Sequence, residues 1–268
     1  MVYTVRIAFV TLALLLSAGP AMAQIKDGSW IRFAGQDGGT VSAKLELPKG
    51  VTGSVPAVIL AHSTNGYEPA LARWAKFFRE QGAASFELDY FTGRGLTNAS
   101  ANIPTPFGDF IEAVKVLTTD PRIDAKRIAL FGQSRGGNMT IMASGGRHES
   151  SYGEARIVAS VALYPSCGNY INGVGKAAFN APLLVLLGTR DSFATPDECK
   201  RFAEAGLVAG RKVEVIVYPD AHHLFDGDED RDGRVAGKTV TFRRNAKVTD
   251  QSRNDVWMFL AEPLGLPK

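Results

Sequence analysis

The sequence predicts an α/β fold, with a mostly parallel central sheet and helices on both faces. Short apolar runs alternate along the chain with segments whose apolar residues have helical spacing. Two of the runs, residues 56–61 and 182–187, contain no charged residue and are typical of strands buried on both faces. Strands that alternate with helices are joined by crossovers, which places neighbouring strands parallel in one sheet.

The first half of the chain supplies an edge hairpin and two strand–helix units. Residues 30–33 and 40–47 alternate apolar and polar side chains around Gly38-Gly39, which predicts an antiparallel hairpin at a sheet edge. A buried strand is expected over 56–61 and a helix over 69–81, which Gly82 ends. The next strand covers 83–88, and the next helix covers 107–117.

The second half repeats the alternation. An apolar run ends at Phe131, and a small-residue helix follows through Ser144. Further strands are expected over 157–164, 182–187 and 213–218, and a terminal helix over 249–260. Length, 45% hydrophobic and 21% charged residues favour one domain over residues 24–268. The net charge of +3 gives no reason to expect a nucleic-acid or membrane partner.

Residues 1–23 have the pattern of a secretory signal peptide. Arg6 precedes the apolar stretch 7–16, and Ala21-Met22-Ala23 is a small-x-small cleavage site. The stretch is shorter than the roughly 20 residues that span a bilayer, although an uncleaved anchor is the alternative. We therefore expect cleavage after Ala23 and a periplasmic or secreted protein.

The central motif is Gly132-Gln133-Ser134-Arg135-Gly136, directly after an apolar strand and before a helix. This order is typical of a nucleophile elbow, a strained turn that exposes a serine hydroxyl above the sheet edge. Glycine at Gly132 and Gly136 leaves room where the strand and helix backbones approach. The motif predicts Ser134 as a nucleophile; by itself it also occurs as an ordinary turn.

A serine nucleophile needs a histidine and an acid, which in this fold follow later strands in the order serine, acid, histidine. Asp191 follows the strand 182–187 and is the candidate acid, with Asp197 and Asp220 as weaker substitutes. His222 and His223 follow the strand 213–218, and one of them is the expected base.

The loop after the strand 56–61 is the expected source of a second oxyanion donor. Thr64 is the first choice and Ser63 the next, while the N–H of Arg135 at the helix start is the other donor. His62 precedes this loop, and we expect it to be a structural histidine bonded to nearby backbone.

These motifs resemble the dienelactone hydrolase family of the α/β-hydrolase superfamily. The resemblance covers nearly all of residues 24–268 and rests on the elbow, the loops 62–66 and 89–95 (with Arg94-Gly95), the turn 188–191, and Tyr218-Pro219-x-Ala221-x-His223-x-Phe225-Asp226. It implies the α/β-hydrolase fold and places the catalytic histidine on His223. Ser134 stands where the enzymes that name the family use cysteine.

The resemblance implies a hydrolase of carboxylic esters or lactones that needs no cofactor and acts on a small molecule. A peptidase of the same fold and a non-catalytic binding protein on this fold are the alternatives. A peptidase would use the same triad. A binding protein is expected to have lost a triad member, and none is missing.

Two further features concern structure. Asp228-x-Asp230-x-Asp232-Gly233 matches half of a calcium loop, but Thr239 stands where the bidentate glutamate belongs, so a solvated acidic insertion is expected and no metal site. The alternative is a bound calcium that would rigidify the histidine loop without taking part in the chemistry. Cys167 and Cys199 form an even pair in a chain predicted to be exported, which favours a disulfide over two buried thiols.

Overall fold

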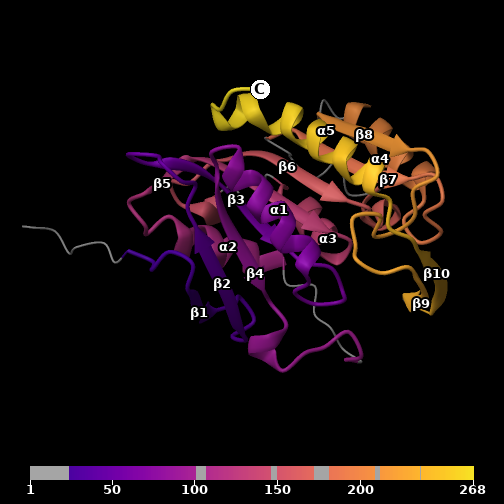
Figure 1. Ribbon diagram of the computed structural model, residues 1–268, viewed down its shortest axis with the longest axis horizontal. Helices are drawn as coiled ribbons and strands as arrows, with labels where there is room; N and C mark the ends of the chain where they lie inside the picture. Colours follow the sequence, from indigo (N-terminus) through magenta and orange to yellow (C-terminus); the bar gives the residue numbers. More distant parts are fainter. Residues whose placement is uncertain (1–23, 101–106, 146–149, 172–180, 209–211, 236) are drawn as a thin grey trace, which may run out of the picture.

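The computed structural model describes residues 24–100, 107–145, 150–171, 181–208, 212–235 and 237–268, so the predicted leader lies outside it. At its centre is an eight-stranded sheet with the order β1-β2-β4-β3-β5-β6-β7-β8 (Figure 1). β2 pairs antiparallel with both β1 and β4, and the other neighbours pair in parallel. The predicted mostly parallel sheet with an antiparallel edge hairpin is confirmed.

The strands of this sheet are β1 Trp30–Ala34, β2 Thr40–Glu46, β3 Val55–Ala61, β4 Ala84–Asp89, β5 Ile123–Gln133, β6 Ile157–Leu163, β7 Leu183–Gly188 and β8 Val213–Tyr218. The central strands are apolar because both of their faces are covered. All residues of β3 and of β7 are buried, as their uninterrupted apolar sequences predict.

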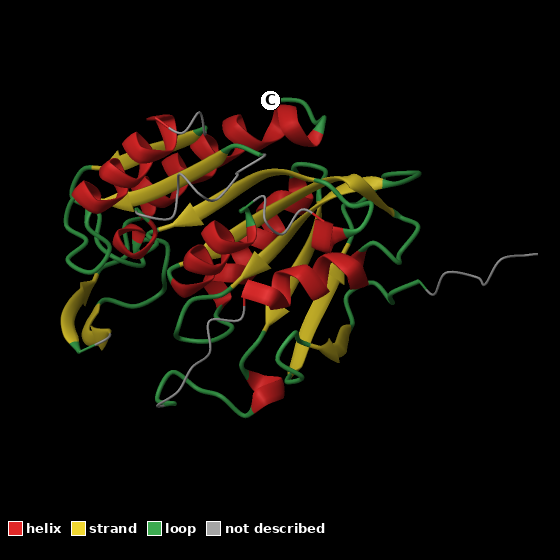
Figure 2. Cartoon of the chain, turned by 180° about the vertical axis from the view of Figure 1, so that it is seen from behind, coloured by secondary structure: helices red, strands yellow, loops and turns green. Residues whose placement is uncertain are grey.

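Helices cover both faces of the sheet (Figure 2). They are α1 Pro69–Glu80, α2 Phe107–Leu117, α3 Arg135–Ala143, α4 Pro196–Val208 and α5 Ala246–Leu264. α1 and α5 share one face, where the rings of Phe77 and Trp257 meet edge to face at 6.3 Å between centroids. α1 follows its sequence pattern: it begins at Pro69 and buries a stripe that includes Leu71, Trp74 and Phe78.

Two parts of the structure differ from the sequence prediction. α5 begins earlier and ends later than predicted, because the side chain of Asn245 caps it by accepting a hydrogen bond from the N–H of Val248 and Gly265 ends it in a left-handed conformation. A separate antiparallel hairpin, β9 Arg231–Val235 and β10 Lys238–Phe242, follows the predicted histidine loop. β9 is charged, and the apolar alternation of β10 is limited to Val240 and Phe242, which is too short to have predicted a hairpin.

The acidic segment 228–232, whose last residues belong to β9, forms ion pairs with arginines. Its acidic side chains are at least about half exposed, and each lies within 4 Å of an arginine. The pairs are Asp228–Arg73, Glu229–Arg231, Asp230–Arg244 and Asp232–Arg243. Within the described ranges no cluster of three or more acidic, histidine or cysteine side chains is arranged to hold a metal ion. The exposure and the ion pairs of these side chains agree with the expected solvated acidic insertion.

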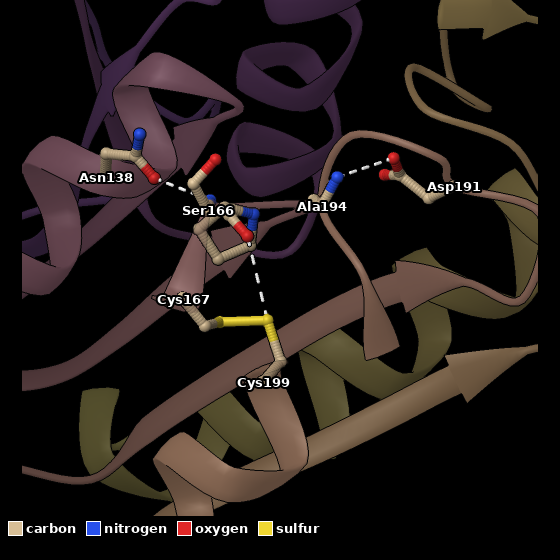
Figure 3. Close-up of a disulfide and its surroundings, with 7 residues drawn as sticks. Asn138, Ser166, Cys167, Asp191, Ala194 and Cys199 are labelled. Carbon is tan, nitrogen blue, oxygen red and sulfur yellow. Dashed lines mark hydrogen bonds between the residues drawn. A yellow bond between two sulfur atoms is a disulfide. The ribbon is translucent and has the colours of Figure 1, made fainter. Parts of the chain in front are cut away.

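Cys167 and Cys199 are joined in a disulfide, with their Cα atoms 4.9 Å apart. Figure 3 shows that the bridge connects the short 3-10 helix η3, Cys167–Tyr170, to α4. Both cysteines are fully buried. The segment that they flank contains β7 and the loop of Asp191, so the disulfide fixes the start of α4 close to that acid.

Replacing both Cys167 and Cys199 by serine is expected to lower the melting temperature by roughly 6–12 °C. The sequence separation is 32, and closing a loop of that length contributes about 3 kcal/mol in the chain-entropy model, with about 2–4 °C for each kcal/mol in a domain of this size. Thermal unfolding of the variant and of the oxidised protein measures the difference. A thiol count on denatured, unreduced protein serves as the control, and two free thiols would refute the bridge.

No helix in the described portion of the chain is both long and apolar enough to cross a membrane.

Candidate functional site

Ser134 lies at the sharp turn between β5 and α3. Its φ of 49° and ψ of −108° are unusual for a residue with a side chain, as the strained turn of an elbow requires. Its N–H donates to the carbonyl of Leu163 at the end of β6. The turn is therefore held from the neighbouring strand, and the hydroxyl stands at the carboxyl edge of the sheet.

Two glycines make this turn possible. A Cβ at Gly132 would lie 2.1 Å from the carbonyl oxygen of Gly136, and one at Gly136 would lie 2.2 Å from the carbonyl oxygen of Ala61. Real side chains do not tolerate such distances, so strand and helix approach closely only with glycine at both positions. The packing thus agrees with the role that the sequence predicts for the two glycines.

Ser134, His223 and Asp191 lie in a line of hydrogen bonds. The Ser134 Oγ is 3.0 Å from His223 Nε2, and His223 Nδ1 is 2.7 Å from Asp191 Oδ2. A carboxylate only accepts, so Nδ1 carries the proton and Nε2 is left to accept the proton of the serine. All three residues are buried, which protects the line from competing water.

Asp191 is fixed by its own loop as well. Its other oxygen, Oδ1, accepts the backbone N–H groups of Phe193 and Ala194 at 2.9 and 2.8 Å; Figure 3 marks the second of these bonds. The two substitute acids lie elsewhere: Asp220 is exposed and paired with Arg190, and Asp197 lies in the first turn of α4. Of the three candidates, only Asp191 contacts His223 in the described structure.

His222 does not join this line. Its ring is half-buried, and its Nδ1 has no hydrogen-bond partner among the described residues. The backbone after His223 turns through Leu224, which has a positive φ of 57°. This turn comes directly after His223, the histidine whose Nε2 lies 3.0 Å from the Ser134 Oγ.

The loop after β3 lies beside the first turn of α3. The Thr64 Oγ1 accepts from Arg135 Nε at 3.3 Å, and the carbonyl of His62 accepts the N–H of Gly136 at 3.1 Å. Thr64 and Arg135, the two predicted oxyanion donors, are thus brought together next to Ser134. Ser63, the second choice, is buried, and its hydroxyl accepts the N–H of Asn65.

His62 has the structural role that the sequence predicts. Its Nδ1 lies 2.7 Å from the carbonyl oxygen of Ser63, which can only accept, so Nδ1 donates. The ring stacks on Tyr90 at 3.9 Å between centroids, and the Tyr90 hydroxyl donates to the carbonyl of His62. The ring therefore stabilises the loop that carries Thr64, and among the described residues its hydrogen bond and its stacking partner are Ser63 and Tyr90, not Ser134.

Arg94, part of the pattern shared with the family, is a structural residue here. Its guanidinium forms two hydrogen bonds with the carboxylate of Asp109 in α2, at 2.8 and 2.9 Å, and one with Asp37 at 2.6 Å. A Cβ at Gly39 would meet its Nε at 2.4 Å, so the side chain packs closely against the β1–β2 turn. The arginine ties three segments together and is only 7% exposed.

A cavity of about 320 Å³ lies next to the triad. Its lining includes Asn65 beside Thr64, Leu224 beside His223, and Phe242, whose backbone forms a β-bridge with His223. Asp228, Glu229, Arg231 and Glu68 supply its charged wall. Burial raises the pKa of Glu68, and with Asp228 and Glu229 it gives the cavity more carboxyl groups than the one guanidinium of Arg231.

Gln133 and Asp226 are two site residues that the sequence does not predict. Gln133 is the last residue of β5 and is buried, and its Nε2 donates to Asp226 Oδ2 at 2.6 Å. A signal existed: a glutamine at the end of an otherwise apolar buried strand must find a hydrogen-bond partner. The sequence did not indicate which residue that partner is.

Comparison with known proteins places these observations in context. The model of the dienelactone hydrolase family matches residues 41–263. A Salmonella typhimurium protein named "Putative carboxymethylenebutenolidase" is 26% identical over 226 residues, which are 78% of this chain and 83% of that protein.

Two solved structures show the same fold. A dienelactone hydrolase-like promiscuous phosphotriesterase, P91, from metagenomic libraries has a TM-score of 0.71 at 17% identity and covers 89% of this chain and 99% of its own. Esterase 2 of Thermogutta terrifontis, solved after phosphorylation by paraoxon, has a TM-score of 0.64 at 15% identity and covers 91% and 98%. The predicted α/β-hydrolase fold is confirmed.

Proposed function

The chain belongs to the dienelactone hydrolase family and is an ester or lactone hydrolase of that kind, and from this premise we propose that it acts through an acyl-enzyme on Ser134. The observation that carries the proposal is the line of hydrogen bonds from Ser134 through His223 to Asp191. Serine becomes an effective nucleophile only when a neighbouring imidazole takes its proton. No cofactor enters the proposal.

In the first half of the reaction, Ser134 Oγ attacks the carbonyl carbon while His223 Nε2 takes the serine proton. Asp191 keeps Nδ1 protonated and stabilises the imidazolium that forms. The backbone N–H groups of Arg135 and Thr64 donate to the negative carbonyl oxygen of the tetrahedral intermediate. His223 then returns the proton to the leaving alcohol, and the acyl group stays on Ser134.

In the second half, a water molecule takes the place of the alcohol. His223 accepts a proton from the water, and the hydroxide attacks the acyl carbon. Collapse of the second tetrahedral intermediate releases the carboxylic acid and returns the proton to Ser134. For a lactone, the alcohol and the acid remain parts of one product.

The substrate is a small ester or lactone, one part of which occupies the cavity beside Leu224. The volume of about 320 Å³ lies at the lower end of the range for small-molecule pockets. The relative from Salmonella typhimurium is named for a lactone, and the esterase of Thermogutta terrifontis reacts with paraoxon. Both names agree with a site for compact acyl or phosphoryl groups.

The enzyme acts outside the cytoplasm. Two observations support export: the signal-peptide pattern of residues 1–23, and the buried disulfide between Cys167 and Cys199, because disulfides persist in oxidising compartments. Amino-terminal sequencing of the protein recovered from the periplasm or medium is expected to begin at Gln24.

Labelling with paraoxon tests the reaction type. Ser134 Oγ is expected to attack phosphorus and expel p-nitrophenolate, leaving one diethyl phosphate on Ser134. Peptide mass spectrometry locates the adduct. The rate of hydrolysis of p-nitrophenyl esters of increasing acyl length is expected to fall in proportion to the fraction of protein that is labelled. Turnover of peptide amides at rates equal to the esters would favour a peptidase, and no labelling and no turnover would favour a binding protein.

A further inference from the structure

Asp226 is a buried carboxylate directly behind the triad, and the mechanism above does not use it. It is 4% exposed. Its Oδ2 accepts from Trp74 Nε1 at 2.7 Å and from Gln133 Nε2 at 2.6 Å, while its Oδ1 lies 2.6 Å from the hydroxyl of Tyr164. A buried acid held by several side chains from distant segments calls for an explanation.

The partners of Asp226 are donors. The indole N–H of Trp74 and the amide NH₂ group of Gln133 can only donate. Burial, together with the nearby Asp226 carboxylate, raises the pKa of Tyr164 well above its ordinary value, so its hydroxyl keeps its proton and donates as well. The site therefore offers hydrogen-bond donors to both carboxylate oxygens of Asp226.

These hydrogen bonds connect the segment of Ser134 with the segment of His223, whose separation determines whether the proton can be transferred. Asp226 lies in the turn that follows His223, closed by the N–H of Gly227 donating to the carbonyl of Leu224. Gln133 is the residue before Ser134. The bond from Gln133 to Asp226 thus links the nucleophile elbow to the histidine loop, independently of the Ser134–His223 contact itself.

Tyr164 provides a second link. It follows β6 with a positive φ of 40°, and its ring meets the imidazole of His223 edge to face at 4.8 Å between centroids. Because the hydroxyl of this tyrosine is bound to Asp226, the carboxylate also fixes the ring that backs the imidazole. Tyr164 packs against the ring of His223, and Asp226 fixes the turn that follows His223 in the chain.

We infer that Asp226 is a positioning residue: its carboxylate fixes the turn after His223 against the residue before Ser134 and thereby sets the distance from Oγ to Nε2. The inference rests on the proposed function. Proton transfer from serine to imidazole depends steeply on that distance, and a displacement of about 1 Å in a catalytic group costs up to about 10²-fold in rate. Substrate binding does not depend on it.

Asp226→Ala is expected to lower kcat, per active site titrated with paraoxon, by about 10- to 100-fold, while KM stays within about threefold. Asp226→Asn is expected to recover most of the rate, because its amide oxygen accepts from Trp74 and Gln133 and its NH₂ group donates to Tyr164. A role in stability alone would reduce the folded fraction and leave the rate per titrated site unchanged.

Asp120→Ala is the matched control. Asp120 is a fully buried aspartate that accepts the N–H of Ile25 and pairs with Arg122. It lies before the amino end of β5, which has 11 residues and spans about 35 Å at roughly 3.3 Å per residue. This variant is expected to lower the melting temperature without lowering kcat per titrated site.

Tyr164→Phe covers the case in which Asp226→Ala does not fold, because it removes only a hydroxyl and keeps the ring beside His223. It is expected to lower kcat by roughly 3- to 10-fold, because it removes the hydrogen bond between the Tyr164 hydroxyl and Asp226. Unchanged kcat per titrated site in Asp226→Ala or Tyr164→Phe, or an equal loss in Asp120→Ala, would overturn the inference. Absence of paraoxon labelling in the unaltered protein would instead overturn the proposed function.

Discussion

Ser134→Ala is expected to lower kcat for ester hydrolysis by about 10⁴-fold or more, with the fold intact. The alanine keeps the strained turn, whose shape is set by Gly132, Gly136 and the bond from the Ser134 N–H to Leu163. What disappears is the only oxygen that His223 Nε2 contacts in the described structure. The members of a catalytic triad act as a unit, so removal of one member loses most of the rate enhancement that the whole triad provides.

The matched control for this variant is Ser160→Ala. Ser160 is a second buried serine, in β6, and its hydroxyl has no hydrogen-bond partner among the described residues. It is expected to retain the activity of the unaltered protein within about twofold, because surrounding contacts change little. Steady-state kinetics and circular dichroism on both variants settle the comparison. Full activity in a folded Ser134→Ala protein would refute the assignment of the nucleophile.

The sheet and the elbow were predictable because they depend on local chemistry. β3 and β7 are uninterrupted apolar runs, and such runs are typical of strands covered on both faces. The elbow requires glycine at fixed offsets from its serine, and the five consecutive residues 132–136 meet this requirement. The order serine, acid, histidine then follows from strand order, so Asp191 and the histidine pair were found without knowledge of tertiary contacts.

Other parts of the site depend on contacts between distant segments. In the hairpin of β9 and β10, β9 is charged and the apolar alternation is limited to Val240 and Phe242 of β10, so the local pattern is too short to mark it. The bond between Gln133 and Asp226 joins residues 93 positions apart, and no local pattern specifies it. The same holds for Arg94, whose role follows from Asp109 and from the space that Gly39 leaves for it.

Two adjacent histidines in the loop after β8 give the sharpest test of the site. His223→Ala is expected to lose activity by about 10⁴-fold or more, because it removes both the proton acceptor of Ser134 and the partner of Asp191. His222→Ala is expected to keep most of its activity. Its ring is half-buried, and its Nδ1 has no partner among the described residues, so truncation breaks no hydrogen bond to that atom.

Each of the two variants is the control for the other, because both remove a histidine side chain from neighbouring positions in one loop. Melting temperatures show whether either change unfolds the loop, and kcat/KM for a p-nitrophenyl ester gives the ranking. The geometry favours His223 because Leu224, directly after it, adopts the left-handed conformation that turns the chain, and Asp226 in the same turn bonds to Gln133 beside Ser134. His223 Nε2 lies 3.0 Å from the Ser134 Oγ, whereas the Nδ1 of His222 has no partner among the described residues. An inactive His222→Ala beside an active His223→Ala would therefore contradict both the assignment of the base and the turn on which it depends.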